Sequence, residues 1–486
     1  METGTKIANI VLAGTGVFCL MLLVYVISRF TWPQERDVAT LAVMLLYYMF
    51  PALLAGLCFA ALRLRPSHRI NSALILLSTG ASIYAGETIM TIWFSLPSVR
   101  AEIAQTERVN RAKQLGVDFD TRSQLEVAAA LRQKGIQAYP TSDPRVFLEK
   151  QADGSFKSTL TIGTEVLPLG WISNRVSILC NESGEYVLYE SDEHGFHNPK
   201  GLWNTGRIEI VALGDSYVHG YCVPSDKNFV DVIRQQYPAT LNLGMAGHGP
   251  LYMLATLKEY AHRVRPKVVL WFHYEGNDLK DLWSERNTPL LMRYLEANFM
   301  QGLSNHQADI DRALMTYVDE VRDTSRMSRR LAEIIQGLGD PRDLLRRTEE
   351  IIKLSQLRQR LGLIYDRGGS SLPREYQSTP RAEIELELFG KVLLQAKEYV
   401  QAWGGTLYFI YLPHWHRYAK PQLADTRRDR VLQTARALGV QVIDIHEVFK
   451  AHDDPLALFP FRLHSHYNET GHRLVADAVL RSVFVR

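Results

Sequence analysis

The sequence predicts an α/β fold in which a parallel sheet follows a group of transmembrane helices. From residue 208 onward, short apolar strands alternate with helical stretches, which is typical of a parallel sheet covered on both faces. Before residue 98, three stretches are almost free of charge. Each has about 20 residues or more, enough to cross a hydrocarbon layer as a helix.

The composition excludes several classes of protein. The 486 residues include 55 Lys and Arg against 52 Asp and Glu, so the formal net charge is +3. This balance argues against a nucleic-acid-binding protein, which is expected to carry a strongly basic domain. The four cysteines are too few for a disulfide-built scaffold, and they form no zinc-ligand pattern with histidines. We therefore expect no metal and no cofactor.

Three transmembrane helices are predicted within residues 1–97, at about 7–27, 38–62 and 71–94. A cleaved signal peptide is the alternative for the first, but no small-x-small cleavage site ends it and two more spans follow. Glu87 is the one charged residue of the third span, where an ionisable group is by default a candidate for function. Snorkelling or pairing with a neighbouring helix is the favoured alternative.

The short loops predict how these spans are oriented. The loop of residues 63–69 carries three arginines, whereas the loop between the first two spans carries two, Arg29 and Arg36. The positive-inside rule therefore places the N-terminus in the cytoplasm and the chain after about residue 97 outside. In a bacterium this arrangement is a multi-pass protein of the inner (cell) membrane with a periplasmic domain.

The chain after residue 97 is predicted to contain two regions. Residues 98–206 predict a helical stalk and a small β-rich pre-domain. Residues 207–486 predict the α/β domain, with a final helix from about residue 469. A charged, helix-rich insertion at about 285–381 interrupts this domain, and it could be either a lid over the site or a solvated helical hairpin.

Three predicted strands end in residues that acyl-ester chemistry needs. Ser216 follows the first strand, Gly247 follows the second and Asn277 follows the third, while His466 precedes the final helix. A serine hydroxyl needs a neighbouring base to accept its proton. The oxyanion of the tetrahedral intermediate needs hydrogen-bond donors, which a glycine N–H and an amide side chain supply.

These residues stand in four blocks that resemble those of the SGNH (GDSL-type) hydrolase family, in the same chain order. The resemblance implies a flavodoxin-like three-layer α/β/α sandwich with five parallel strands. It implies that Ser216 is the nucleophile, that His466 is the general base, and that Ser216, Gly247 and Asn277 supply the oxyanion-hole N–H groups. The blocks are Gly-Asp-Ser216-Tyr-Val-His-Gly, Asn242-Leu-Gly-Met-Ala-Gly, Glu275-Gly-Asn-Asp and His466-Tyr-Asn-Glu-Thr-Gly-His.

One position departs from the family pattern. The family usually has an aspartate two or three residues before the base histidine, where this chain has His464 and Leu463. Either a Ser–His dyad works alone, or a carboxylate reaches the ring from elsewhere. Asp453 and Asp454 are the nearest upstream candidates.

The remaining histidines and cysteines give weaker indications. His472 is expected to be structural, and His219 could either touch substrate or pack near the nucleophile. The pair His414 and His416 lacks a third metal ligand. Among the cysteines, those outside the predicted membrane spans could form a disulfide in an oxidising compartment; they are Cys180 and Cys222.

Taken together, these observations predict a membrane-anchored extracytoplasmic serine esterase. The expected substrate is an O-acyl group, acetyl above all, on an envelope or exported glycan or a lipid-linked sugar. An O-acyltransferase that modifies an exopolysaccharide would use the same residues, and a polytopic membrane partner delivering acyl groups would favour it. A weakly catalytic or non-catalytic glycan-binding subunit is the third alternative.

Overall fold

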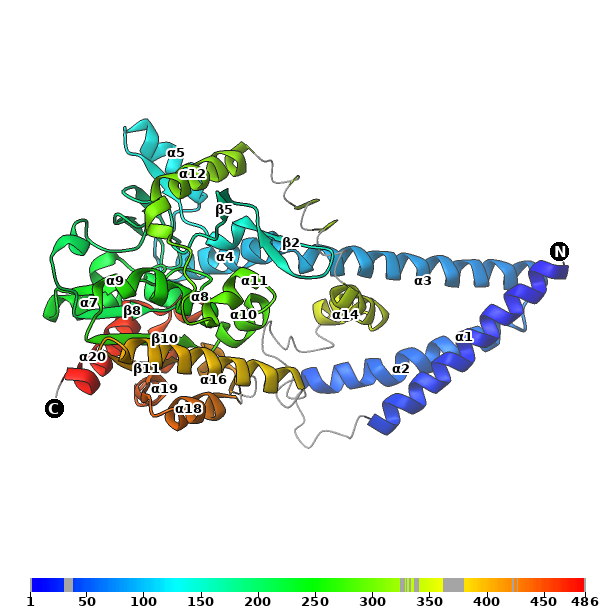
Figure 1. The fold of residues 1–486 in the computed structure, drawn as a ribbon. Coiled ribbons are helices and arrows are strands. Elements are labelled where there is room, and N and C mark those ends of the chain that lie inside the picture. Colours follow the sequence, from blue (N-terminus) through cyan, green and yellow to red (C-terminus); the bar gives the residue numbers. More distant parts are fainter. Residues whose placement is uncertain are drawn as a thin grey trace. The chain divides into compact units, whose positions relative to one another are not determined.

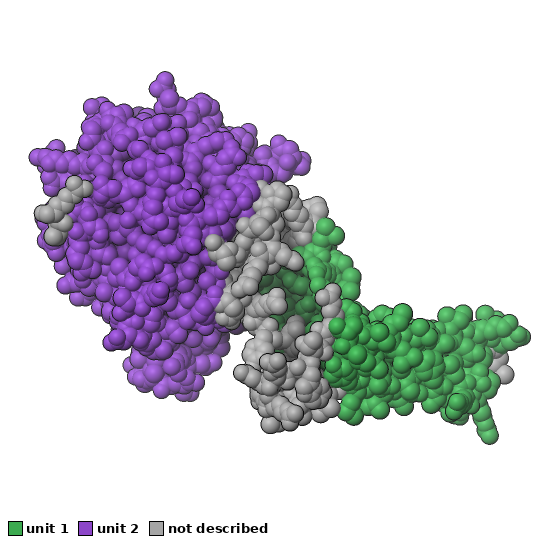
Figure 2. All heavy atoms as spheres, turned by 90° about the horizontal axis from the view of Figure 1, so that it is seen from below, with its two compact units in different colours: residues 1–102, 326–367 green, residues 103–325, 368–486 purple. Residues whose placement is uncertain are grey.

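The structure is a computed structural model of the chain. It describes residues 2–29, 38–323, 328, 330–331, 334–335, 341–361, 380–421, 424–425 and 427–484. Contacts divide the chain into two compact units (Figure 2). Unit 1 comprises residues 1–102 and 326–367, and unit 2 comprises residues 103–325 and 368–486. The insertion predicted at about 285–381 is therefore shared between the two units.

Unit 1 is built on long apolar helices, α1 (Glu2–Arg29), α2 (Val38–Ala61) and α3 (Pro66–Ser95). α1 packs against both α2 and α3, and large apolar side chains are exposed along all three helices. Two helices are long and apolar enough to cross a membrane, over Glu2–Ser28 and Pro66–Ser95, while the apolar stretch found in α2, Leu46–Ala61, is shorter. Within the described residues, the first and third predicted spans thus meet this criterion of length and composition.

Unit 2 contains the predicted parallel sheet (Figure 1). Its five strands are all parallel, in the order β12-β11-β10-β8-β9. Their bounds are β8 (Ile210–Leu213), β9 (Thr240–Asn242), β10 (Val268–Tyr274), β11 (Thr406–Leu412) and β12 (Gln441–Asp444). The strands are parallel, so their carboxyl ends lie at one edge of the sheet, which is where an α/β fold places its site.

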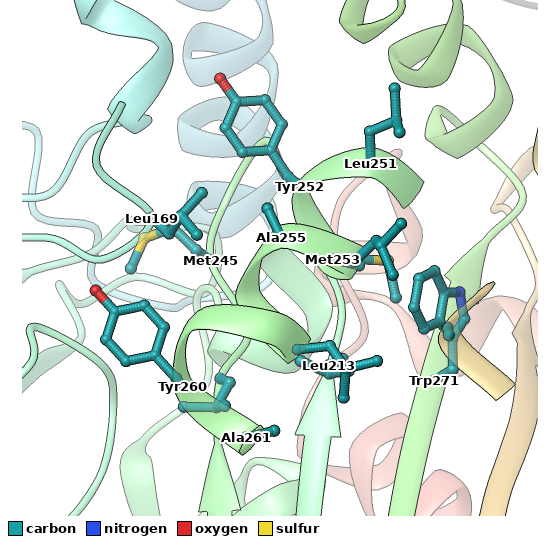
Figure 3. Packing of buried hydrophobic residues seen from close by; sticks show 14 of the residues in the cluster. Leu169, Leu213, Met245, Leu251, Tyr252, Met253, Ala255, Tyr260, Ala261 and Trp271 are labelled. Carbon is teal, nitrogen blue, oxygen red and sulfur yellow. The ribbon is translucent and has the colours of Figure 1, made fainter. Parts of the chain in front are cut away.

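Alternate residues of the strands enter two separate cores, as the two-residue period of a strand requires. On one face, Leu213 and Trp271 pack in a cluster with residues of α8 (Pro250–Thr256), some of which Figure 3 shows. Residues of α16 (Pro380–Gln401) and α18 (Arg428–Ala437) belong to the same cluster. On the other face, Ala212 and Phe272 pack with residues of α7 (Phe229–Gln236), α19 (Ile445–Lys450) and α20 (Glu469–Phe484). The sheet is therefore covered on both faces, and the α/β prediction is confirmed.

The region before β8 shares the first of these cores. Leu169 and Trp171 are fully buried in the same cluster as Leu213, and Figure 3 shows Leu169 beside Met245. Three small sheets lie in this region. They are β1 (Ala138–Pro140) with β6 (Val176–Ile178) and β7 (Leu188–Glu190), β2 (Leu148–Lys150) with β3 (Phe156–Ser158), and β4 (Thr161–Ile162) with β5 (Thr164–Glu165). Residues ahead of the parallel sheet thus pack directly on the layer that carries the candidate site.

The other helices of unit 2 are α4 (Pro97–Gln114, which begins in unit 1), α5 (Gln124–Gln133), α6 (Ser216–His219), α7 (Phe229–Gln236), α8 (Pro250–Thr256), α9 (His262–Val264), α10 (Asp278–Glu285), α11 (Pro289–Met292), α12 (Gln307–Asp323), α16 (Pro380–Gln401), α17 (His416–Ala419), α18 (Arg428–Ala437), α19 (Ile445–Lys450) and α20 (Glu469–Phe484). The short strands are β1 (Ala138–Pro140), β2 (Leu148–Lys150), β3 (Phe156–Ser158), β4 (Thr161–Ile162), β5 (Thr164–Glu165), β6 (Val176–Ile178) and β7 (Leu188–Glu190). Unit 1 also holds α14 (Pro341–Ile352) and α15 (Ser355–Arg360).

Candidate active site

The turn after β8 presents Ser216 at the carboxyl edge of the sheet. Ser216 is the first residue of α6, and the Asp215 side chain accepts a hydrogen bond from the backbone N–H of Tyr217 at 3.0 Å. Gly214 is required here because a Cβ at this position would overlap the side chain of Val218. Asp215 is 2% exposed and holds the turn, so the strand, turn and helix together fix the position of the hydroxyl.

His466 reaches this hydroxyl from the loop before α20. Its Nε2 lies 2.9 Å from Ser216 Oγ, although the two residues are 250 positions apart in the chain. Nε2 can accept the hydroxyl proton when the other ring nitrogen, Nδ1, carries the hydrogen. The structure therefore brings together the two residues predicted as nucleophile and base.

The carboxylate beside His466 is Glu182, a residue that the sequence reasoning missed. Glu182 Oε2 lies 3.2 Å from His466 Nδ1, and the same oxygen accepts the backbone N–H of His466 at 2.8 Å. Arg108 of α4 contacts the other oxygen at 3.1 Å. Among the described residues, the Ser216–His466 pair thus has a carboxylate on the far side of the ring.

The environment of Glu182 keeps its carboxyl ionised. Burial alone would raise its pKa, but the charge and hydrogen bonds of His466, together with the charge of Arg108, outweigh burial and lower the pKa to about 2. An ionised acceptor on Nδ1 holds the ring in one orientation and one tautomer and stabilises the imidazolium that forms during catalysis.

The upstream aspartates proposed from the sequence have other surroundings. Asp454 forms an ion pair with Arg462, and neither Asp453 nor Asp454 has a described contact with His466. Glu182 comes from a segment 284 residues before the histidine. The one sequence feature that indicated this segment is Cys180, which lies two residues before Glu182 and was a candidate disulfide partner of Cys222.

A disulfide between Cys180 and Cys222 ties the Glu182 segment to the turn that carries Ser216. The two Cα atoms are 5.0 Å apart. Cys222 follows Ser216 by six residues, so the covalent link keeps Glu182 on the same side of the sheet as the serine. This is the pairing that the sequence suggested for an oxidising compartment.

The two other oxyanion candidates lie in the loops after β9 and β10. Gly247 has φ +82°, a conformation that favours glycine, and a Cβ there would overlap the side chain of Asp143. Asn277 precedes α10, and its Nδ2 donates one hydrogen bond to Asp281 Oδ2 at 2.7 Å. An amide has two N–H groups on this nitrogen, so Asn277 can donate a second one.

Asp143 and Arg145 link these two loops, and the sequence reasoning did not find them. Both belong to the short turn around η1 (Pro144–Phe147), ahead of the parallel sheet. Arg145 pairs with Asp143, which lies against Gly247, and its Nη1 lies 3.2 Å from Asp281 Oδ1. Asp281 in turn holds the Asn277 amide. The pair therefore positions the backbone of one oxyanion candidate relative to the side chain of the other.

We expect Asn277→Ala to lower kcat by about 10²–10³-fold and to change KM little, because an oxyanion donor acts on charge that develops in the transition state. Steady-state hydrolysis of a small ester measures both constants. Asn305→Ala, which changes an exposed asparagine of unit 2, is the matched control and should retain full activity. A rise in KM with unchanged kcat would contradict the assigned role.

The other histidines divide into buried and clustered ones. His219 is fully buried; its Nε2 lies 2.8 Å from the Tyr189 hydroxyl, and its Nδ1 accepts the backbone N–H of Ala246 at 3.3 Å. This placement favours the packing alternative, and it supports the loop that leads to Gly247. His472 is also fully buried, and its Nδ1 accepts the Phe229 N–H at 3.1 Å.

His414, His416 and His464 form a contact cluster. His414 Nε2 lies 3.0 Å from His464 Nε2, and His414 Nδ1 lies 3.0 Å from His416 Nδ1. Burial first, and then the neighbouring histidines, lower the pKa of His414 to about 2. The two contacts use opposite nitrogens of His414, so the ring nitrogens of the three histidines do not point at one common position, as they would around a metal ion.

One group of three side chains among the described residues has metal-ligand spacing: Glu182, Cys222 and His466. Its sulfur is bonded to Cys180 and offers no thiolate. The His466 imidazole already contacts the Glu182 carboxylate through Nδ1 and the Ser216 hydroxyl through Nε2. This donor set fits acyl transfer by a serine better than it fits a metal.

No protein-family model and no curated protein sequence matches the chain. Similar solved structures include a member of the lipolytic protein G-D-S-L family from Veillonella parvula, with 14% identity and a TM-score of 0.30, covering 58% of this chain and 100% of that one. A lipase/acylhydrolase from Enterococcus faecalis has 13% identity and a TM-score of 0.30, covering 57% and 95%. An acetylxylan esterase from Geobacillus stearothermophilus has 12% identity and a TM-score of 0.30, covering 57% and 95%.

Proposed function

We propose that the protein is a membrane-anchored serine esterase of the SGNH type, acting on O-acyl esters of an envelope or exported glycan. The observation that carries this proposal is the contact of 2.9 Å between Ser216 Oγ and His466 Nε2, with Glu182 on the opposite nitrogen. A hydroxyl, a base and an ionised carboxylate in this relation are the parts of an activated serine nucleophile.

The reaction proceeds in two steps. Ser216 Oγ attacks the ester carbon while His466 Nε2 accepts the hydroxyl proton, and the backbone N–H groups of Ser216 and Gly247 and the Asn277 amide donate to the oxyanion. The ester C–O bond then breaks, and His466 returns the proton to the leaving alcohol. In the second step, water attacks the acyl-enzyme while His466 Nε2 accepts a proton from it. The acyl–Oγ bond then breaks, the proton returns to Ser216 Oγ, and the acid is released.

A groove of unit 2 that includes the η1 turn supports a polymeric substrate. Its volume is about 590 Å³, and Phe147 of η1 and Tyr317 of α12 line it with ring centroids 6.0 Å apart. Arg145 lies on the same short η1 turn, at the loops of the oxyanion candidates. Aromatic faces combined with the polar side chains of Thr159, Thr161 and Asp309 suit a sugar chain.

Three features support the proposed location. The apolar helices α1 and α3 are long enough to span a bilayer. The Cys180–Cys222 disulfide suits an oxidising compartment, such as a bacterial periplasm. The arginines of loop 63–69 favour a cytoplasmic N-terminus, which after three crossings places the catalytic unit outside the inner membrane.

The test uses the full-length protein in detergent with an acetylated oligosaccharide, in the presence and absence of unacetylated sugar acceptors. Free acetate formed equally in both conditions supports the esterase. Acetylated acceptor formed at the expense of free acetate supports the O-acyltransferase, which would draw on an acyl-donating membrane partner. Binding of the oligosaccharide without any acyl release would overturn both and support the glycan-binding subunit.

A further inference from the structure

Part of the insertion packs against the proposed membrane anchor. α14 (Pro341–Ile352) and α15 (Ser355–Arg360) belong to unit 1, and both pack on α3. Figure 2 shows the compact unit to which they belong in green. Neither alternative considered from the sequence, a lid or a solvated hairpin, requires a fixed contact with an apolar helix.

Glu87 holds α15 against α3. Its carboxylate is fully buried; Oε1 accepts the backbone N–H of Gln356 at 2.7 Å and Oε2 accepts that of Leu357 at 2.8 Å. The first N–H groups of a helix have no partner within the helix. These two bonds therefore give hydrogen-bond partners both to the start of α15 and to the buried carboxylate of Glu87. An ionisable group within a membrane span is expected to face the protein interior and to have a partner there.

Arginines of the insertion lie on aromatic rings at the end of α3. The guanidinium of Arg330 is 4.7 Å from the ring centroid of Trp93 and contacts Glu102 at 2.7 Å. The guanidinium of Arg360 is 4.1 Å from the ring centroid of Phe94. Tryptophan and arginine at the end of a span are typical of the membrane–water interface. Such contacts are the kind expected at the level of the lipid headgroups.

The exposed surface of α14 has two different sides. Leu345 and Ile352 are seven residues apart and lie on one line of the helix, with Leu344 at the border of the same apolar stripe; they are 72%, 66% and 46% exposed. The neighbouring side carries the ion pairs Arg346–Glu350 and Lys353–Glu349. A leucine stripe next to a charged side, on a helix beside apolar helices, is the pattern of a helix lying in a membrane interface.

We infer that α14 lies in the plane of the membrane–water interface, on the outer side of the membrane that α1 and α3 span. Its stripe of Leu344, Leu345 and Ile352 contacts lipid acyl chains. This inference rests on the proposed membrane anchoring. The occupant of the stripe is the bilayer, because α14 packs on α3, an apolar helix that itself exposes Ile75 and Ile89 to 65% and 67%. Glu87 and the two arginines hold α14 and α15 at this depth.

The experiment places single cysteines on the full-length chain in nanodiscs of phosphatidylcholine and phosphatidylglycerol. Cys19 and Cys58 are changed to serine, while Cys180 and Cys222 stay bonded to each other. An environment-sensitive fluorophore is attached at Leu345→Cys, at Ile75→Cys as the anchor reference, and at Lys391→Cys on α16 as the aqueous reference. Nitroxide-labelled lipid and aqueous iodide serve as quenchers.

We expect the probe at residue 345 to emit at shorter wavelength than the probe at 391, and to lose fluorescence to nitroxide lipid as the probe at 75 does. Glu87→Gln should reduce the lipid quenching at 345 and leave that at 75 unchanged. Quenching at 345 that matches 391 while 75 responds to lipid would overturn this inference alone. Absence of lipid quenching at 75 would overturn the membrane anchor together with it, and unchanged quenching in Glu87→Gln would overturn the role given to Glu87.

Discussion

Ser216→Ala is expected to lower kcat for ester hydrolysis by about 10⁶-fold, the loss typical of removing the nucleophile from a serine triad. The alanine has no oxygen to form the acyl-enzyme, so only direct attack by water on the bound ester remains, assisted by the oxyanion donors. Initial rates of p-nitrophenyl acetate hydrolysis by the full-length protein in detergent measure the loss.

The matched control is Ser482→Ala, which changes an exposed serine on α20 and should retain the wild-type rate. Thermal unfolding of both variants shows whether the fold is intact, and we expect the Ser216→Ala midpoint to stay near that of the wild type. A kcat of Ser216→Ala within about tenfold of the wild-type value would show that another group is the nucleophile, because the residual rate left by the oxyanion donors alone is far lower. It would then contradict the proposed mechanism.

Glu182→Gln is expected to lower kcat by up to about 10⁴-fold, as removing the orienting carboxylate does in a serine triad. A glutamine amide can donate to His466 Nδ1, which would leave the hydrogen on Nε2 and prevent it from accepting the Ser216 proton. KM for a small ester should change little, because Glu182 acts through the ring and is a positioning residue. Glu190→Gln on β7, an exposed partner of Lys200, is the matched control.

The pH dependence of stability distinguishes this role from simple packing. The Glu182 pKa is lowered in the folded protein from 4.5 to about 2. A lowered carboxyl pKa stabilises the fold fully above about pH 4.5, and this contribution is lost as the pH falls towards 2. The difference in unfolding midpoint between wild type and Glu182→Gln should therefore be largest at neutral pH and shrink between pH 4.5 and 2. A difference that does not depend on pH would contradict an ionised Glu182.

The local chemistry of the site could be predicted from sequence because it depends on short-range order. Apolar strands followed by Gly-Asp-Ser216 or by Gly-Asn277 place those residues at the carboxyl edge of a parallel sheet, whatever the rest of the chain does. His466, just before the last helix, completes the set through the resemblance to the SGNH blocks, which implies its role as the base. Each of these residues lies at a strand end or a helix start, and periodicity and turn residues are enough to predict where a strand ends or a helix begins.

Residues that enter the site from distant segments could not be predicted in this way. Glu182 lies 284 residues before His466, in a turn without regular pattern, and it reaches the ring because the disulfide and the shared core bring that turn to the nucleophile. Asp143 and Arg145 reach Gly247 and Asn277 for the same kind of reason. Contacts between segments far apart in the chain are decided by packing, which no local pattern records.

The same distinction applies to the membrane part. The sequence alone determined the apolar spans and the presence of one carboxylate, Glu87, within the third, because hydropathy and length are properties of the segment itself. Only the tertiary structure decided the partner of this carboxylate, the start of α15 some 270 residues later. A buried charge requires a partner, but the rule does not say which one; the fold supplies it when α15 packs on α3.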